Sequence, residues 1–206
     1  MTTAFSATEI QPVILAFPSP ITEDVLLALG HDNPEYRFET TAEGSLVVTP
    51  LTGTFASGGE AELTYQLVAW NKRYTLGRVT PSTGGVTLAD NATKGPDGTF
   101  ISHARLASLS PSRKKRAFEK IAPNAVFELL SPSDSLTYTV SKCEEYVATG
   151  SDVAVLLNPR NRSVTLYRPG QEPIIAPDIT AVVIGDEMPH FILKAQDVFD
   201  AGQDPA

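Results

Sequence analysis

The sequence predicts a single domain of the α/β (α+β) class, in which helices flank a central mixed β-sheet. Its 206 residues are enough to bury one core. Two continuous apolar runs, 125–130 and 153–157, enclose a helical stretch at about 134–149, which is the order of a parallel strand-helix-strand crossover. A turn at 158–161 and an alternating run at 163–167 add an antiparallel strand, so the sheet is expected to be mixed.

The predicted domain covers the whole chain, 1–206, and has three parts. These are an N-terminal extension with a short helix (1–33), a core (34–200) and a tail (201–206). Prolines mark the extension, but apolar residues recur at helical spacing over 21–29. Thr22 can cap a helix there, because the acidic residues Glu23 and Asp24 follow it.

The core is expected to begin with a hairpin and an amphipathic helix. Strand-like runs at 36–39 and 45–49 flank Gly44, which suits a tight turn. Apolar residues then recur at three-to-four spacing over about 60–76 and predict a helix packed on the sheet. Between this helix and the crossover, dense turn signals separate two or three short strands.

The formal net charge of −8 argues against tight binding of nucleic acid over the whole surface, because affinity for DNA comes largely from Lys and Arg side chains. One basic run is the exception and is a candidate contact for DNA: Arg113, Lys114, Lys115 and Arg116. The alternative interpretation of this run is a solvated charged loop.

Other sequence features predict a cytoplasmic protein with no membrane partner. The one cysteine, Cys143, cannot form an internal disulfide, and the first residues lack the charged and apolar regions of a signal peptide. No apolar run approaches the roughly 20 residues that a membrane-spanning helix requires. Cys143 is expected to be a small core residue.

Glu128 is the most informative residue of the sequence. It is the only charge in the apolar run 125–130, whose composition predicts burial on both faces of a strand. A buried carboxylate is costly unless a partner compensates it. A divalent metal is one such partner, since Mg²⁺ prefers oxygen ligands and usually takes one or two carboxylates.

Asp97 and Lys142 are the candidates that would complete a site around Glu128. Asp97 lies in a turn that leads into a short strand, so two neighbouring strands would bring the two carboxylates together. Lys142 flanks the expected apolar stripe of the helix at 134–149 and can reach the sheet edge. That stripe is predicted to consist of Leu136, Val140, Cys143 and Val147.

Each of these residues also has a structural interpretation. Glu128 could lie half-exposed on an edge strand, paired with a surface lysine. Asp97 could serve only as a turn former, because Asp is favoured in turns. Lys142 could extend to solvent from its helix, or pair with Glu145 or Tyr146, as most helix lysines do.

The order of these residues resembles the Uma-type family of restriction endonucleases, within the PD-(D/E)xK nuclease superfamily, over residues 36–199. The first acidic motif matches Pro96-Asp97, and the superfamily lysine, absent from the strand at Leu130, is supplied by Lys142. The strongest match is Pro-Asn-Ala-Val-Phe-Glu-Leu-Leu-Ser-Pro-Ser-Asp-Ser at 123–135, followed by Lys142, Tyr146, Gly150 and the Leu-Asn-Pro at 157–159.

The resemblance implies a restriction-endonuclease-like core and a DNA endonuclease that hydrolyses phosphodiester bonds with Mg²⁺ or Mn²⁺. Asp97 and Glu128 would hold the metal, with help from the Leu129 carbonyl. Lys142 would place the nucleophilic water, and Glu39, just ahead of the hairpin turn, would be a further acidic ligand or a base. Duplex cleavage by such folds generally pairs two sites, so a homodimer is expected.

The sequence departs from the family pattern at three places. The family usually shows aspartate where Asn124 and Asn158 stand, and a histidine ahead of the amphipathic helix, where this chain has Ser-Gly-Gly-Glu at 57–60. Glu39, as one acid near a hairpin, has a structural interpretation of equal standing. The rival hypothesis is therefore a catalytically weak or inactive nuclease-fold protein that acts in binding or assembly.

Overall fold

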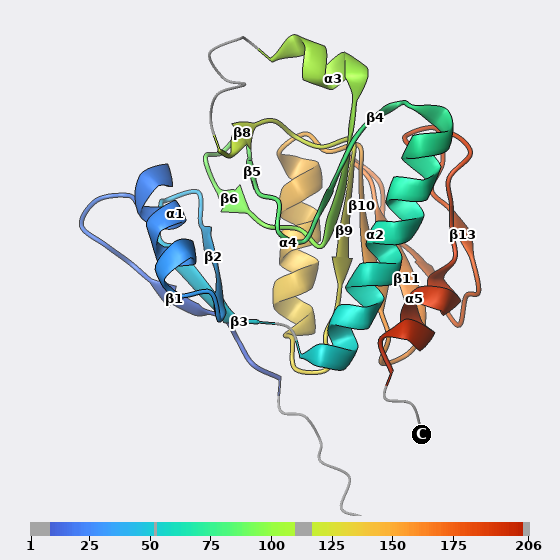
Figure 1. Ribbon diagram of the computed structural model, residues 1–206, viewed down its shortest axis with the longest axis horizontal. Coiled ribbons are helices and arrows are strands. Elements are labelled where there is room, and N and C mark those ends of the chain that lie inside the picture. The colour runs from blue at the N-terminus through green and yellow to red at the C-terminus, as the bar shows by residue number, and fades with distance from the viewer. Residues whose placement is uncertain (1–8, 52, 110–116, 204–206) are drawn as a thin grey trace, which may run out of the picture.

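The computed structural model describes residues 9–51, 53–109 and 117–203. A six-stranded sheet with the strand order β12-β11-β10-β9-β7-β4 forms its centre (Figure 1). Its strands are β4 (Gly77–Pro81), β7 (Gly98–Ser102), β9 (Ala125–Leu129), β10 (Val153–Asn158), β11 (Ser163–Tyr167) and β12 (Ile174–Ala176). Only β9 and β10 pair in parallel, and the other neighbours within this sheet are antiparallel. The predicted mixed sheet is confirmed.

The parallel pair is joined by the predicted crossover helix, α4 (Leu136–Ala148). Ser135 caps this helix, because its side chain accepts a hydrogen bond from the Tyr138 N–H at 3.3 Å. β11 then returns antiparallel to β10, with Asn158 opposite Ser163 across the turn. The order of strand, helix, strand and hairpin follows the sequence prediction.

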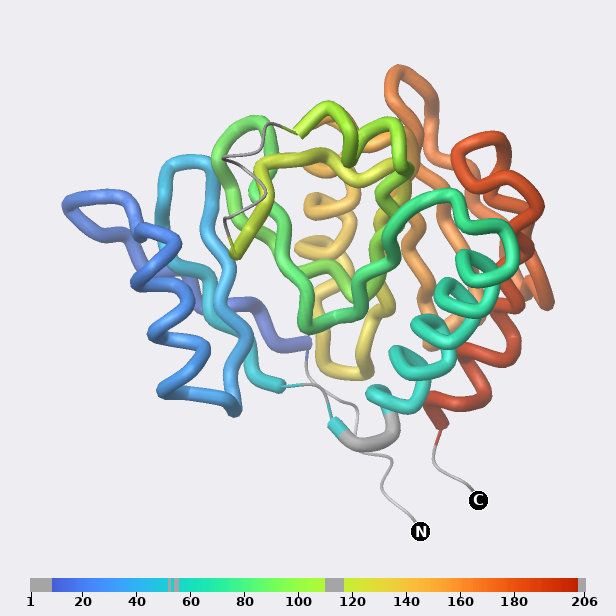
Figure 2. Tube along the Cα trace, turned by 45° about the horizontal axis from the view of Figure 1, so that its top comes forward, coloured from blue at the N-terminus to red at the C-terminus, as the bar shows by residue number. Residues whose placement is uncertain are grey.

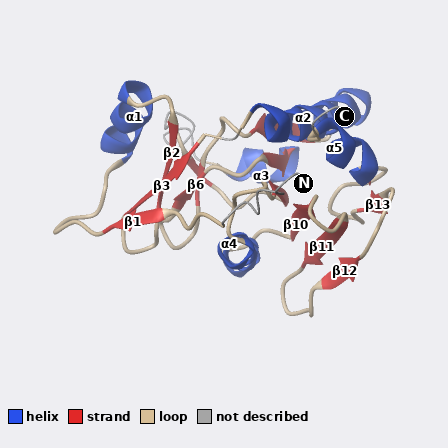
Figure 3. Ribbon diagram, turned by 90° about the horizontal axis from the view of Figure 1, so that it is seen from below, coloured by secondary structure: helices blue, strands red, loops and turns tan. Residues whose placement is uncertain are grey.

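Helices cover both faces of the main sheet. Figure 3 shows α4 on one side of the strands, and α2 (Thr54–Tyr74) and α5 (Ala195–Ala201) on the other. Along β9, Phe127 belongs to the core that includes α2 and α5, whereas Val126 belongs to the core that includes α4. Since successive side chains of a strand point to opposite faces, Glu128 points towards α4.

α2 begins at Thr54, six residues before the predicted start, and so includes the Gly58-Gly59 pair. These glycines lie where α5 approaches α2. A Cβ at Gly58 would be 2.3 Å from the Ala201 carbonyl oxygen, and one at Gly59 would be 3.0 Å from that of Val198. Glycine is unfavourable in a helix, which is why the sequence favoured a later start, but here close packing requires it.

A smaller sheet lies beside the main one and carries the N-terminal residues (Figure 2). Its strand order is β1-β3-β2, and its elements, with the neighbouring helix, are β1 (Val13–Leu15), α1 (Glu23–Asp32), β2 (Tyr36–Thr40) and β3 (Leu46–Pro50). The hairpin and the short helix are confirmed, and the Thr22 side chain accepts from the Val25 N–H as a cap at 3.4 Å. β1 pairs with β3 across the predicted boundary at residue 34, and the three-part division of the chain stays a prediction.

The remaining elements are short. β5 (Val86–Thr87) lies between β6 (Thr93–Lys94) and β8 (Glu119–Lys120), β13 (Val182–Val183) pairs with β14 (Ile192–Leu193), and α3 (His103–Ser108) follows β7. No helix in the described part of the chain is long and apolar enough to cross a membrane. The basic run from Arg113 to Arg116 lies outside the described residues.

Leu67 offers a test of the α2 packing. Its side chain is fully buried against the main sheet, so we expect Leu67→Ala to lower the free energy of unfolding by about 2–5 kcal/mol through lost burial and the cavity that remains. Urea denaturation measures this. The control is Tyr65→Ala on the same helix, where a side chain with 66% exposure should change stability by less than about 0.5 kcal/mol. Equal effects of the two substitutions would contradict the packing.

Candidate active site

Glu128 is buried in the middle of the sheet, since β9 lies between β7 and β10. The edge-strand alternative is therefore wrong. Two side chains of α4 contact the carboxylate: Lys142 Nζ lies 3.0 Å from Oε1, and the Tyr146 hydroxyl donates a hydrogen bond to Oε1 at 2.8 Å. The buried Glu128 carboxylate is thus compensated by two side chains of the crossover helix that follows it.

Lys142 also reaches across to the smaller sheet. Its Nζ lies 3.1 Å from Oε1 of Glu39 on β2, and the same oxygen accepts the Gly95 N–H at 2.8 Å. The lysine is 8% exposed, so the solvent-facing alternative is wrong. Glu145, on the same helix, pairs instead with Lys94 at 2.9 Å. Lys142 therefore joins α4, β9 and β2 at one point.

Asp97 stands beside Glu128 because β7 and β9 pair with Gly98 opposite Phe127. One carboxylate oxygen of Asp97 accepts the Leu129 N–H at 2.8 Å, and the other lies 2.9 Å from Arg37 on β2. Arg37 also binds Glu60 of α2 at 3.0 Å. The turn that precedes β7 thus places Asp97 inside an ion-pair network.

These groups surround a cavity of about 80 Å³. Its lining includes the four predicted site residues, which are Glu39, Asp97, Glu128 and Lys142. Leu129 also contributes to the lining. The N-terminal residues Ile10 and Pro12 lie over the same cavity, and the Ile10 N–H donates to the Ser133 carbonyl at 2.6 Å. Residues far apart in the chain therefore converge on one small polar space.

The sequence analysis missed two members of the network, Arg37 and Glu60. Arg37 precedes Glu39 by two residues on a strand, so the two side chains share a face, and this spacing could have linked them. Glu60 stands at the predicted start of the α2 helix, and no local pattern relates it to Arg37. Its role depends on a contact between the start of a helix and a distant strand.

The chain is similar to a known protein family and to a solved structure. The profile of a family named Uma2, described as "Putative restriction endonuclease", matches residues 23–193. The chain belongs to the Uma2 family. A crystal structure of a protein described as a putative nuclease, from Anabaena variabilis, has a TM-score of 0.73 at 22% identity and covers 89% of this chain and 100% of that one. At this identity the likeness shows the fold alone, and it confirms the predicted α/β (α+β) class with a central mixed sheet flanked by helices. No curated protein matches.

The two asparagines that depart from the Uma2 pattern lie outside the cavity lining. Asn124 accepts the Ser102 N–H at 2.8 Å and donates to Asp152 at 2.8 Å, so it joins the β7 end to the loop before β10. Asn158 accepts the Arg160 N–H at 3.0 Å within the turn after β10. Both side chains have structural partners and do not contact Glu128 or Asp97.

The two central carboxylates of this Uma2 protein are hard to ionise. Burial raises the pKa of Glu128 to about 7, because desolvation and the neighbouring Asp97 outweigh the Lys142 ammonium. Burial and the nearby Glu60 carboxylate likewise raise the pKa of Asp97, against the opposing effect of Arg37. Near neutral pH Glu128 is therefore partly protonated, and a bound cation could replace that proton.

Glu39 and Lys142 behave in the opposite way. Burial alone would raise the pKa of Glu39, but Lys142 and Lys94 bring it below its ordinary value. The Glu128 and Glu39 carboxylates raise the pKa of Lys142 well above its ordinary value despite its burial. Lys142 therefore stays protonated between the two carboxylates. Glu39 ionises more readily than Glu128, because Lys94 as well as Lys142 lowers the pKa of Glu39.

Within residues 9–51, 53–109 and 117–203, no three Asp, Glu, His or Cys side chains form a ready-made metal group. Arg37 and Lys142 account for this, because they occupy carboxylate oxygens of Asp97, Glu39 and Glu128. The donor chemistry still fits a hard divalent cation. Together with Glu60, four carboxylates face Arg37 and Lys142, while the nearby Lys94 is paired with Glu145. A fully ionised cluster therefore carries two uncompensated negative charges.

The raised pKa of Glu128 predicts a specific dependence of stability on pH. A carboxyl with a pKa of about 7 in the folded state and an ordinary value of 4.5 favours folding fully below pH 4.5, and this contribution is lost as pH rises through 7. Glu128→Gln cannot ionise. In chelator, the stability of this variant relative to the unsubstituted protein should therefore rise between pH 5 and pH 8, by roughly 3 kcal/mol at about 1.4 kcal/mol per pKa unit.

Urea denaturation at both pH values measures that difference. The matched control is Glu144→Gln, because Glu144 is exposed on the same helix as Lys142. This variant should keep the pH dependence of the unsubstituted protein. A constant offset between Glu128→Gln and the unsubstituted protein at pH 5 and pH 8 would show that Glu128 ionises normally.

Proposed function

We propose that this Uma2-family protein is a divalent-metal-dependent DNA endonuclease that hydrolyses phosphodiester bonds. The observation that carries the proposal is the meeting of Asp97, Glu128, Glu39 and Lys142 at one buried cavity of about 80 Å³. The membership of a family described as restriction endonucleases supports nuclease-like function. The proposal includes DNA contact by the basic run, a homodimer as the form that cuts both strands, and a cytoplasmic location.

We assign the metal to Asp97 and Glu128, with the Leu129 carbonyl as a further oxygen ligand. Mg²⁺ or Mn²⁺ suits such an all-oxygen set. When bound, the ion would supply Lewis acidity and a water of lowered pKa. The Leu129 N–H, which donates to Asp97 at 2.8 Å, holds that carboxylate in a fixed orientation. Arg37 would have to release one Asp97 oxygen as the ion enters.

The remaining side chains act on the water and the phosphate. The Lys142 ammonium, charged over the whole working range of pH, orients a nucleophilic water and stabilises the negative charge that develops on the phosphate. Glu39 is ionised because its pKa is lowered, so it can accept a hydrogen bond from that water or serve as its base. Arg37, once freed from Asp97, is a second cation for the scissile phosphate.

One observation favours the rival function. Arg37 and Lys142 compensate the acids internally, as in a structural ion-pair network, and a protein that never binds metal would keep this arrangement. Such a protein would use the nuclease fold for binding or assembly. The two candidates differ in whether metal binds at Asp97 and Glu128.

Cleavage of supercoiled plasmid tests the proposal directly. We expect nicking that requires Mg²⁺ or Mn²⁺ and stops with chelator. It should fall about 100-fold or more in Glu128→Gln, which removes a charged metal ligand, and in Lys142→Met, which removes a cation that stabilises charge in the transition state. The controls are Glu144→Gln and Lys72→Met, two exposed helix positions that should keep full activity. All variants are first checked for native near-ultraviolet circular dichroism. Metal-independent nicking, or nicking indifferent to Glu128 and Lys142, would reject the site.

Metal binding has a readout separate from cleavage. Mn²⁺ at about 100 times its dissociation constant should stabilise the protein by about 2.7 kcal/mol in thermal unfolding. Asp97→Asn should abolish this gain, because it removes a charged ligand. Arg37→Met should instead tighten Mn²⁺ binding, because Arg37 competes for the same carboxylate at 2.9 Å. A gain that is unchanged in Asp97→Asn would favour the rival function.

A further inference from the structure

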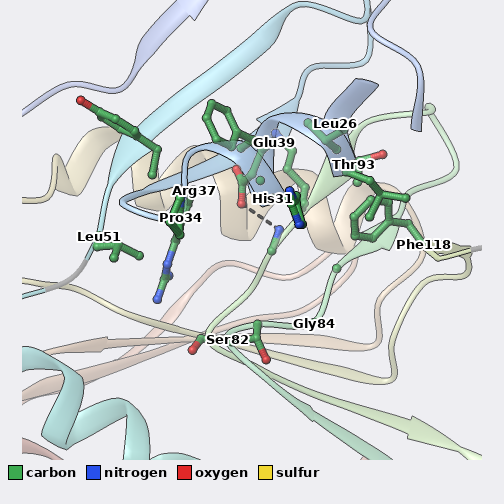
Figure 4. Close-up of a pocket in the computed structure, with 18 of the residues that line it drawn as sticks. Leu26, His31, Pro34, Arg37, Glu39, Leu51, Ser82, Gly84, Thr93 and Phe118 are labelled. Carbon is green, nitrogen blue, oxygen red and sulfur yellow. Dashed lines mark hydrogen bonds between the residues drawn. The ribbon is translucent and has the colours of Figure 1, made fainter. Parts of the chain in front are cut away.

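A second, larger cavity adjoins the candidate active site. It has a volume of about 600 Å³ and lies between the α1–β2 side of the smaller sheet and the loops that carry β5 and β6 (Figure 4). Four residues line both cavities, namely Arg37, Glu39, Glu60 and Gly95. The larger cavity, which we call the side cleft, therefore shares a wall with the space around Asp97 and Glu128.

The walls of the side cleft combine apolar and aromatic side chains with polar and charged ones, among them His31, Glu60 and Lys94. Leu26, Leu51 and Phe118 lie around the cleft (Figure 4), and Tyr36 and Phe38 of β2 also line it. The lining also includes Gly84, Gly85 and Gly95, which have no side chain to fill the side cleft. Such a space suits a flat, hydrophobic group with polar edges.

Phe118 is held in place from two sides. Its ring lies directly on the backbone at Gly85, where a Cβ would be 2.6 Å from Cδ1 of the ring. Glu23 in the first turn of α1 accepts the Ala117 N–H at 2.8 Å and so ties this segment to the other wall. A fixed, half-buried aromatic ring is the type of surface on which a nucleobase stacks.

The volume of the side cleft and the net charge of the protein limit which ligands could bind there. A volume of about 600 Å³ is in the range of pockets that enclose small ligands, and it is too small to enclose a DNA duplex. The chain has a net charge of −8, so stacking has to supply affinity that phosphate contacts do not. Arg37 lies where the two cavities meet and can face the phosphate next to a bound base.

We propose that the side cleft binds unpaired nucleotides next to the scissile phosphate, so that the substrate of this protein is a single strand or a nucleotide turned out of a duplex. The inference rests on the proposed nuclease function. A duplex would have to open locally before its phosphate could reach Asp97 and Glu128, at the cost of unstacking. A single strand reaches the same position without that cost.

Gly30 provides a variant that closes the side cleft without touching the active site. It lies in α1 and lines the cleft, and a Cβ built there meets no atom within 4 Å. Gly30→Trp should fill the space, whereas Gly30→Ala should leave it open and favour the helix. Phe118→Ala removes the stacking surface, and Tyr65→Ala, an exposed aromatic outside the cleft, is its control.

The measurement is fluorescence anisotropy in chelator, with a labelled oligothymidylate and a labelled duplex of similar length as probes. We expect the single strand to bind at least about tenfold more tightly than the duplex, and Phe118→Ala to weaken its binding about 5- to 100-fold. Gly30→Trp should weaken it at least about tenfold, while Gly30→Ala and Tyr65→Ala stay within about twofold. Equal binding of both probes, binding of neither, or binding indifferent to Gly30→Trp and Phe118→Ala would overturn the inference.

Plasmid nicking by the same variants separates this inference from the proposed function. Metal-dependent cleavage that persists unchanged in Gly30→Trp, without preference for single strands, rejects the side-cleft inference and keeps the nuclease. Selective binding of the single strand without any cleavage rejects the nuclease and keeps a cleft for unpaired nucleotides.

Discussion

The Lys142 ammonium is the interaction on which the rest of the site depends. It lies between Glu39 of β2 and Glu128 of β9, at 3.1 Å and 3.0 Å, and so connects the crossover helix to both sheets. Removing one partner of such a buried pair typically costs about 3–5 kcal/mol, because the other charge is left uncompensated. The smaller sheet is thus held against the main sheet by charge, where apolar packing would otherwise be needed. The same contact gives the active-site cavity one of its walls.

Helices and strands that follow from local sequence patterns were predicted correctly. The start of α2 and the buried face of α4 were not, because packing and polar contacts with distant residues determine them. The crossover and its antiparallel return follow from apolar runs and turn residues alone. The start of α2 was missed because Gly58 and Gly59, which weaken a helix locally, are needed for the approach of α5. α4 buries Lys142 and Tyr146 together with Cys143, and Leu136, expected in the apolar stripe, is 36% exposed. The face of α4 that packs on the sheet is therefore the one that carries the partners of Glu128, and it differs from the predicted apolar stripe.

The same distinction explains how far the site could be predicted. A lone acid in an apolar strand and a lysine on the next helix stand out because burial of either is costly without a partner. Arg37 carries no such signal, since an exposed hairpin strand would hold an arginine equally well. Its partners, Asp97 and Glu60, belong to a turn and a helix that only the folded chain brings together. Metal roles for individual residues remain predictions that sequence and geometry support jointly.

Charge balance links the stability of the fold to its chemistry. With Asp97 and Glu128 ionised, the four carboxylates of the cluster have two negative charges more than Arg37 and Lys142 can compensate. Because the pKa of Glu128 is raised to about 7, a proton on this carboxyl offsets part of the excess near neutral pH. A divalent cation carries the matching charge and would release that proton on binding. Arg37 would then lose its contact with Asp97 and become available to a phosphate that enters beside it. The internal counter-ions therefore do not argue against metal chemistry, because they keep the acids compensated until both metal and substrate arrive.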